Sequence, residues 1–173
     1  MTRRVSLRDF QATLASRLKA AAGEAAPALC LGFEAGGERW LAQLAGSGEV
    51  LQVPEIQRVP LTRDWFLGVA NIRGVLYGVS DFGAFLGQPP VARGPANRLL
   101  LAGQPFGVNC ALLVSRLTGL RNLGDFERAE PGERHAGWTA GDWRDQDGQL
   151  WRELDAQRLL AQHAFLDIAA QQS

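Results

Sequence analysis

Side chains that could perform acid–base or nucleophilic chemistry are few and far apart in this sequence. His135 and His163 are the only histidines, and no HExxH, GxSxG, P-loop or GxGxxG pattern occurs in the chain. Asp81 and Asp155 could act as a carboxylate pair, but each is expected where a strand ends and a short helix begins, so helix capping explains them better. We therefore predict that the protein is not an enzyme and uses no cofactor or metal. A small hydrolase that combines either aspartate with His135 is the weaker alternative.

The two cysteines, Cys30 and Cys110, each lie within an apolar run typical of a strand. Neither belongs to a CxxC pair, and no second metal ligand stands nearby in the sequence. We expect two small buried core residues rather than a disulfide or a reactive thiol. The five tryptophans are also expected to pack in the core, with some available as anchors at an interface.

Composition restricts the class of partner. The 173 residues are 46% hydrophobic, which suits one large domain or two small lobes with a shared core. Eighteen basic residues balance eighteen acidic ones, and this balance argues against nucleic-acid binding. No apolar run approaches the roughly 20 residues that span a bilayer, and residues 1–11 lack the apolar centre of a secretory signal. The sequence therefore predicts a cytoplasmic protein that does not insert into a membrane.

Residues 1–24 predict an N-terminal helix, because apolar residues recur there at helical spacing behind Ser6, a suitable N-cap. This apolar stripe consists of Leu7, Phe10, Leu14, Leu18 and Ala21. After a break at Ala25–Pro27, the runs on either side of Gly36–Gly37 predict paired strands joined by a tight turn. The helix is thus expected to be separate from the strands.

The strand that follows this hairpin is expected at the edge of a sheet. Residues 49–61 contain Pro54 and Pro60, which cannot donate a hydrogen bond to a neighbouring strand. The segment is therefore an edge strand or an irregular crossing.

One motif occurs twice in the chain: glycine, leucine two residues later, an aromatic residue at the third position and aspartate at the seventh. The first copy runs from Gly74 to Asp81, and the second runs from Gly148 to Asp155, 74 residues further on. In both copies, two apolar residues stand four and five positions after the aspartate. The pattern predicts two copies of one structural unit.

Spacing upstream of the motif refines this repeat. The hairpin aromatics Trp40 and Phe106 are 66 residues apart, eight fewer than the 74 residues between the two motif copies. This shortfall of eight residues predicts an insertion in the acidic loop of the second copy. Two such units predict a mainly β fold of two pseudo-symmetric, five-stranded, SH3-like barrels that share a core. We place lobe 1 at about 28–86, a linker at 87–97 and lobe 2 at about 98–168. All three lie within a domain of residues 25–173 that ends in a short helix.

The segment Phe66–Leu86, FLGVANIRGVLYGVSDFGAFL, resembles the signature of the CheW-like chemotaxis adaptors. In that signature, Asn-Leu-Arg-Gly is followed by a strand and by an aspartate that opens a short helix. Asn71-Ile72-Arg73-Gly74 matches the first part, and Glu49-Val50 matches the family's upstream Glu-Ile pair at the expected distance. Ser47 stands where typical members carry an apolar residue. Within the family, the chain looks most like the PilI-like adaptors of type IV pilus (twitching) chemosensory systems.

The resemblance implies a non-catalytic adaptor that couples a chemoreceptor to a CheA-type histidine kinase and controls type IV pilus motility. One lobe would meet the regulatory domain of the kinase, and the groove between the lobes would receive the cytoplasmic helical-hairpin tip of the receptor. Arg73 and Glu49 carry over as partner contacts, with Ser47, Asn71 and Gly74 beside them. An orphan two-barrel interaction scaffold without a kinase is the alternative.

The residues themselves allow two interpretations of Arg73. It is expected to lie exposed within reach of Glu49, where its planar guanidinium could bind a partner carboxylate. It could equally form a surface salt bridge worth less than about 1 kcal/mol to the fold.

Overall fold

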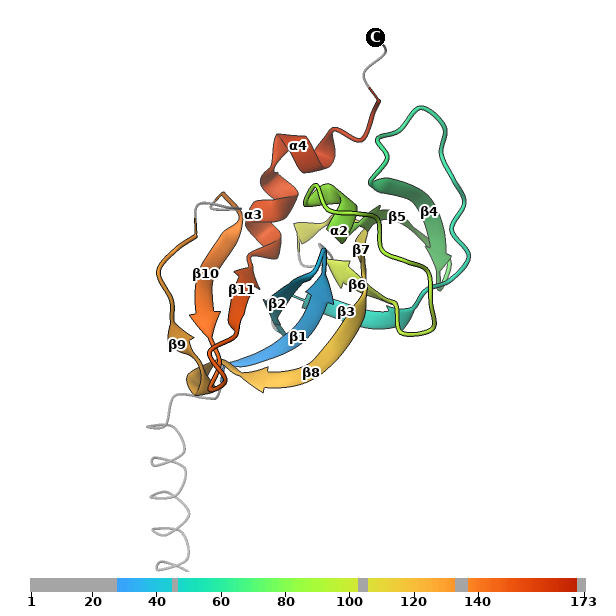
Figure 1. Ribbon diagram of the computed structural model, residues 1–173. Helices are drawn as coiled ribbons and strands as arrows, with labels where there is room; N and C mark the ends of the chain where they lie inside the picture. The colour runs from blue at the N-terminus through green and yellow to red at the C-terminus, as the bar shows by residue number, and fades with distance from the viewer. Residues whose placement is uncertain (1–27, 45–46, 103–105, 133–136, 171–173) are drawn as a thin grey trace, which may run out of the picture.

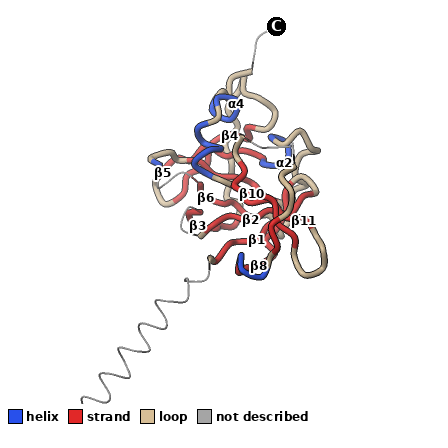
Figure 2. Tube along the Cα trace, turned by 90° about the vertical axis from the view of Figure 1, so that its left-hand side faces the viewer, coloured by secondary structure: helices blue, strands red, loops and turns tan. Residues whose placement is uncertain are grey.

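The computed structural model describes residues 28–44, 47–102, 106–132 and 137–170 (Figure 1). Strands make up most of the regular structure, and the helices are short (Figure 2). The fold is mainly β, as predicted. The N-terminal helix predicted for residues 1–24 lies outside the described residues, and so does His135.

The first sheet has six strands in the order β8-β1-β2-β11-β10-β9. Their bounds are Arg116–Asn122, Leu29–Ala35, Glu38–Gln43, Leu150–Leu154, Thr139–Arg144 and Glu127–Arg128, respectively. β1 and β2 form the predicted hairpin, in which Gly36 and Gly37 make the turn with positive φ angles of 60° and 74°. The short strand β9 follows β8 through the 3-10 helix η2 (Leu123–Asp125) and pairs with β10. This pairing closes the sheet into a barrel.

The second sheet has five strands in the order β3-β6-β7-β5-β4. Their bounds are Ser47–Gln52, Arg98–Ala102, Cys110–Val114, Val75–Asp81 and Phe66–Ile72, respectively. β3 is an edge strand, and the irregular segment behind it crosses to β4, the opposite edge. There the backbones of Gln57 and Val69 exchange two hydrogen bonds of 2.8 and 2.9 Å. These bonds close the second barrel.

Each barrel combines strands from both halves of the chain. β2 pairs in parallel with β11 of the second repeat, and β5 of the first repeat pairs in parallel with β7. The two repeats have therefore exchanged hairpins: β1–β2 of the first repeat lies in the barrel of β8–β11, and β6–β7 of the second repeat lies in the barrel of β3–β5. The barrels consequently do not follow the predicted lobe boundaries of 28–86 and 98–168, because local sequence patterns cannot show which of two similar hairpins a strand will join.

Strand register confirms the repeat but corrects one of its spacings. Gly78 and Arg152 occupy the same place in the two motif copies, and they pair with Cys110 and Trp40, respectively. Trp40 is therefore equivalent to Cys110, 70 residues away, and not to Phe106, which lies before the strand at a turn. The predicted shortfall of eight residues is thus reduced to four.

A shared hydrophobic core joins the barrels, as predicted. The largest buried cluster contains Phe33 and Trp40 from the first sheet together with Leu100 and Leu112 from the second. Trp40 stacks on Trp138 with ring centroids 5.5 Å apart. Two smaller clusters fill the barrel interiors, one around Tyr77 and Leu113 and the other around Cys30, Leu41 and Trp151.

Three short helices cover one side of the junction between the barrels: α2 (Phe82–Phe85), α3 (Ala156–Ala161) and α4 (His163–Leu166) (Figure 1). Asp81 caps α2 by accepting the Ala84 amide at 3.0 Å, and Asp155 caps α3 by accepting the Arg158 amide at 2.9 Å. The two aspartates are thus symmetry-related helix caps. The short C-terminal helix is confirmed, and His163 lies on it.

Candidate functional site

Arg73 and Gly74 form the two-residue turn of the β4–β5 hairpin, at one end of the second barrel. Their φ angles are 53° and 84°, the left-handed combination that a type I′ turn requires. Glycine adopts this conformation freely, whereas arginine rarely does. The Oδ1 atom of Asn71 accepts the Gly74 amide at 2.8 Å and so holds the turn. Asn71 therefore holds the turn that carries Arg73 and is itself exposed.

The guanidinium of Arg73 binds the carboxylate of Glu49 with both of its terminal nitrogens. Nη1 donates to Oε2 at 2.6 Å, and Nη2 donates to Oε1. Both side chains are exposed, Arg73 by 70% and Glu49 by 41%. The hydrogen bond from Arg73, with its positive charge, lowers the pKa of Glu49 below 4.5, and Glu49 raises the pKa of Arg73. The predicted contact is thus present on the surface.

This ion pair spans the seam of the second barrel, because Glu49 belongs to edge strand β3 and Arg73 links β4 to β5. An exposed ion pair contributes little to folding in water, because solvent screens its charges. Its polar groups remain accessible for binding. The same barrel end carries two exposed apolar side chains, Val75 at 42% and Leu76 at 61%.

Two further predicted site residues lie on these same elements. Ser47 begins β3, where it pairs with Ala102. Gly74 has open space where a side chain would stand, so the backbone of a partner could approach it closely. The exposed apolar residues Val75 and Leu76 were missed by sequence reasoning, although two apolar residues directly after an Asn-Xaa-Xaa-Gly turn could have indicated them.

The equivalent end of the first barrel differs chemically. By the repeat spacing, Asp147–Gly148 replaces Arg73–Gly74, and Asp145 replaces Asn71. Burial raises the pKa of Asp145, but hydrogen bonds from the Trp151 indole and from backbone amides outweigh this effect, so the net pKa is lowered. The equivalent ends of the two barrels therefore differ: the second barrel carries an Arg–Glu ion pair, and the first carries an acidic turn.

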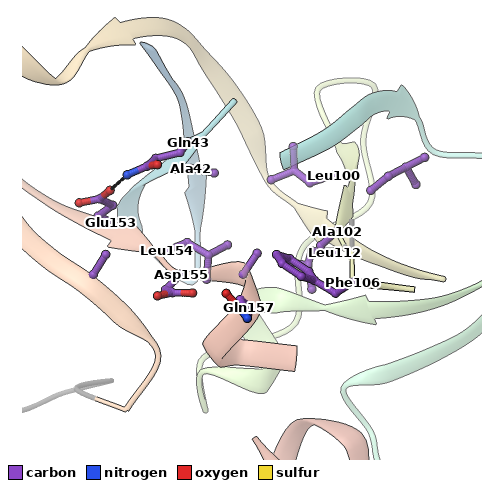
Figure 3. Close-up of a pocket in the computed structure, with 13 residues that line it drawn as sticks. Ala42, Gln43, Leu100, Ala102, Phe106, Leu112, Glu153, Leu154, Asp155 and Gln157 are labelled. Carbon is purple, nitrogen blue, oxygen red and sulfur yellow. Dashed lines mark hydrogen bonds between the residues drawn. The ribbon is translucent and has the colours of Figure 1, made fainter. Parts of the chain in front are cut away.

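A pocket of about 180 Å³ lies between the two sheets (Figure 3). Ala42 and Leu154 line it from the first sheet, and Leu100 and Ala102 line it from the second, with Phe106 at its side. Glu153 is buried beside the pocket, where its Oε1 accepts Gln43 Nε2 at 2.6 Å and its Oε2 accepts the indole of Trp143. The pocket is thus largely apolar, and the carboxylate on its polar side has hydrogen-bond partners for both oxygens.

The cysteines are free and buried, as predicted. Burial raises the pKa of Cys110 to about 12, and burial followed by the charge of Glu153 raises that of Cys30 to about 11. Both are therefore neutral thiols near pH 7. Among the described residues, no group of three His, Cys, Asp or Glu side chains could hold a metal, and no helix is both long and apolar enough to cross a bilayer.

A family model described as the CheW-like domain matches residues 29–164, from β1 into α4. The chain belongs to the CheW-like family. CheW-like proteins are adaptors and scaffolds rather than enzymes.

Two known proteins are similar to this chain, one in sequence and one in fold. Protein PilI of Pseudomonas aeruginosa is 32% identical over 95 residues, 54% of this chain and 52% of PilI, so the chain spans about half the length of this curated relative. The crystal structure of scaffolding protein TtCheW from Thermoanaerobacter tengcongensis superposes with a TM-score of 0.63 at 18% identity, covering 75% of this chain and 89% of that one. The similarity to TtCheW shows the fold.

Proposed function

We propose that this CheW-like protein is a cytoplasmic chemosensory adaptor that couples a receptor to a CheA-type histidine kinase in the control of type IV pilus motility. The observation that carries the proposal is the Arg73–Glu49 pair, displayed at a barrel end. Similarity to PilI supports the pilus system, and family membership supports the adaptor role.

The kinase surface, in this proposal, is the end of the second barrel. Arg73 offers a planar set of donors, and Leu76 offers apolar area next to it. An arginine beside an apolar side chain is the composition found at the centre of many interfaces. The regulatory domain of the kinase would bind here, with Ser47, Asn71 and Gly74 shaping the surface around the ion pair.

The receptor surface is the groove between the barrels. The pocket there has apolar walls from both sheets and a polar wall at Glu153. An amphipathic helix places its apolar face into such a groove. The cytoplasmic tip of a receptor, a helical hairpin, would therefore lie along it.

Calorimetric titration with the isolated regulatory domain tests the kinase surface. Arg73→Ala should weaken binding about 30-fold, the equivalent of losing about 2 kcal/mol at an interface anchor. Arg116→Ala is the matched control, because Arg116 also binds a carboxylate, Glu34, through two hydrogen bonds of 2.8 Å on the surface of the other barrel. Equal affinities for wild type and Arg73→Ala would refute the assignment.

A second binding experiment tests the groove and distinguishes a receptor–kinase adaptor from a scaffold that has no kinase partner. Ala140 lines the pocket and is exposed, so Ala140→Arg should block a receptor tip without unfolding the protein. We expect this variant to lose receptor binding and to keep kinase binding. A wild-type protein that binds neither the kinase domain nor a receptor tip would instead be a scaffold for other partners.

A further inference from the structure

An apolar surface remains uncovered where the described chain begins. Leu29, Leu44 and Leu120 are exposed by 44%, 40% and 63%. Leu29 and Leu44 are neighbours across β1–β2, where the Leu44 amide donates to the Leu29 carbonyl at 3.3 Å. Leu120 pairs with Leu31 across β1–β8. The three leucines thus form one surface, which we call the leucine surface.

The leucine surface continues the sheet face that carries the shared core. Residues opposite each other in an antiparallel pair point to the same side, and so do residues two apart in a strand. Leu31, which lies between Leu29 and Phe33 on β1, is 6% exposed and belongs to the shared core. The same face is therefore buried by the second barrel along part of its length and bare beyond it.

An acidic rim borders the leucine surface. Leu120 lines a hollow of about 270 Å³ together with Asp125, Asp145 and Asp147, and with Arg121 as its single basic residue. Three carboxylates against one guanidinium leave this rim with a net negative charge. A basic amphipathic segment would match both the leucines and the rim.

Residues 1–22 have that chemistry and arrive at that place. They contain five basic residues and one acidic residue, and their apolar residues recur at the spacing of one helix face. The chain enters β1 at Ala28, whose carbonyl accepts the Leu123 amide beside the rim. Gly23–Pro27 can span roughly 16 Å when extended, enough for the chain to reverse its direction.

We propose that residues 7–22 fold back as an amphipathic helix and cover the leucine surface, with Leu14 and Leu18 against Leu29, Leu44 and Leu120. Basic residues of the segment then face the acidic rim. Leu44 directly follows Gln43, which lines the pocket between the barrels, so the helix borders that groove. This inference does not depend on the proposed partners.

Hydrogen–deuterium exchange of the full chain tests the proposal. In the wild type, amides of residues 7–18 should exchange at least tenfold more slowly than in a disordered peptide. Leu120→Asp should remove this protection, whereas Leu76→Asp, a matched change of a leucine exposed by 61% on the other barrel, should leave it unchanged. An unprotected segment in the wild type, or protection that survives Leu120→Asp, would overturn the proposal.

Cross-linking provides a second measurement that does not rely on protection. Cysteines introduced by Leu14→Cys and Leu120→Cys should be joined within one chain by a short bis-maleimide, because both native thiols are buried and do not compete. The pair Leu14→Cys and Leu76→Cys should not be joined. Cross-links found only between chains would show that the segment docks on a second copy, and would overturn the intramolecular arrangement.

Discussion

Arg73 adopts a backbone conformation that costs energy for a residue with a side chain, and Asn71 and Glu49 hold it there from two directions. Strained residues of this kind concentrate where function needs one fixed geometry. The type I′ turn requires this positive φ, and in this conformation the Arg73 side chain reaches Glu49. The turn therefore supports the proposal that this guanidinium is oriented for recognition.

The ion pair predicts a shifted titration. Glu49 should titrate below its ordinary value of 4.5, because ionised Glu49 accepts hydrogen bonds from Arg73. The pair's contribution to folding is therefore present above the unfolded pKa and is lost as pH falls through the lower folded pKa. Carboxyl-detected NMR titration should show this midpoint in the wild type. It should return towards 4.5 in Arg73→Ala, and an unchanged midpoint would contradict the pairing.

The two capping aspartates should differ in their importance for stability. Asp81 is 1% exposed and accepts amides from both Ala84 and Val91, so it anchors the loop behind α2 as well as the helix. Asp155 is partly exposed and accepts a single amide. Asp155→Ala should cost about 1 kcal/mol, and Asp81→Ala should cost more, about 3 kcal/mol, because it also removes the acceptor of the part-buried Val91 amide. Urea unfolding of both variants measures the difference, and equal losses would show that the loop anchor is unimportant.

At the scale of single elements, the barrel seam depends on a glycine. Gly68 has a φ of 132°, and a Cβ there would lie 2.0 Å from the carbonyl oxygen of Gln57. The two hydrogen bonds that close the second barrel lie directly beside this contact. No side chain can occupy this position without separating the strands.

Gly68→Ala should therefore cost roughly 3 kcal/mol or more. Gly119→Ala is its control, because Gly119 also has a positive φ, 103°, but faces open space. The control should lose only about 1 kcal/mol, from backbone strain alone. Thermal unfolding compares the two variants, and similar midpoints would mean that the seam contributes nothing to stability.

Local elements could be predicted from the sequence because their signals are local. Gly36–Gly37 specifies a tight turn, and each capping aspartate precedes a short apolar helix. Arg73 was expected to lie within reach of Glu49, and the structure shows this contact. Val75, Leu76 and the pocket residues were not predicted, because exposure depends on which strands cover a face and not on the side chain itself.

At the scale of the whole molecule, the hairpin exchange could not be predicted. β2 and β7 are both apolar, and either could pair with β5 or β11 by pattern alone. Aligning aromatic residues also equated Trp40 with Phe106, whereas strand register equates it with Cys110. Pairing between distant parallel strands leaves no mark in a short window of sequence.

The exchange predicts that neither half of the chain can fold alone. Cleavage between Ala92 and Arg93, within the loop that joins α2 to β6, leaves two fragments that each lack part of both barrels. Each fragment should be unfolded by circular dichroism, and the 1:1 mixture should regain the native spectrum. Trp40→Asp in the first fragment, which places a charge in the shared core, should prevent this recovery. Two fragments that fold independently would contradict the exchange.

The exchanged hairpins also impose an order on biosynthesis. Every strand of the second barrel has been translated once Val114 has been added, but the β1–β2 hairpin must wait for β11, whose Arg152 pairs with Trp40. At the usual 5–20 residues per second, the ribosome takes between about 6 and 22 s to travel from Trp40 to Arg152. During that interval the first hairpin has emerged with its core side chains but without its parallel neighbour. The nascent chain therefore carries the β1–β2 hairpin, with its buried aromatic residues, without its parallel neighbour for most of its synthesis, and that hairpin is where a molecular chaperone would bind.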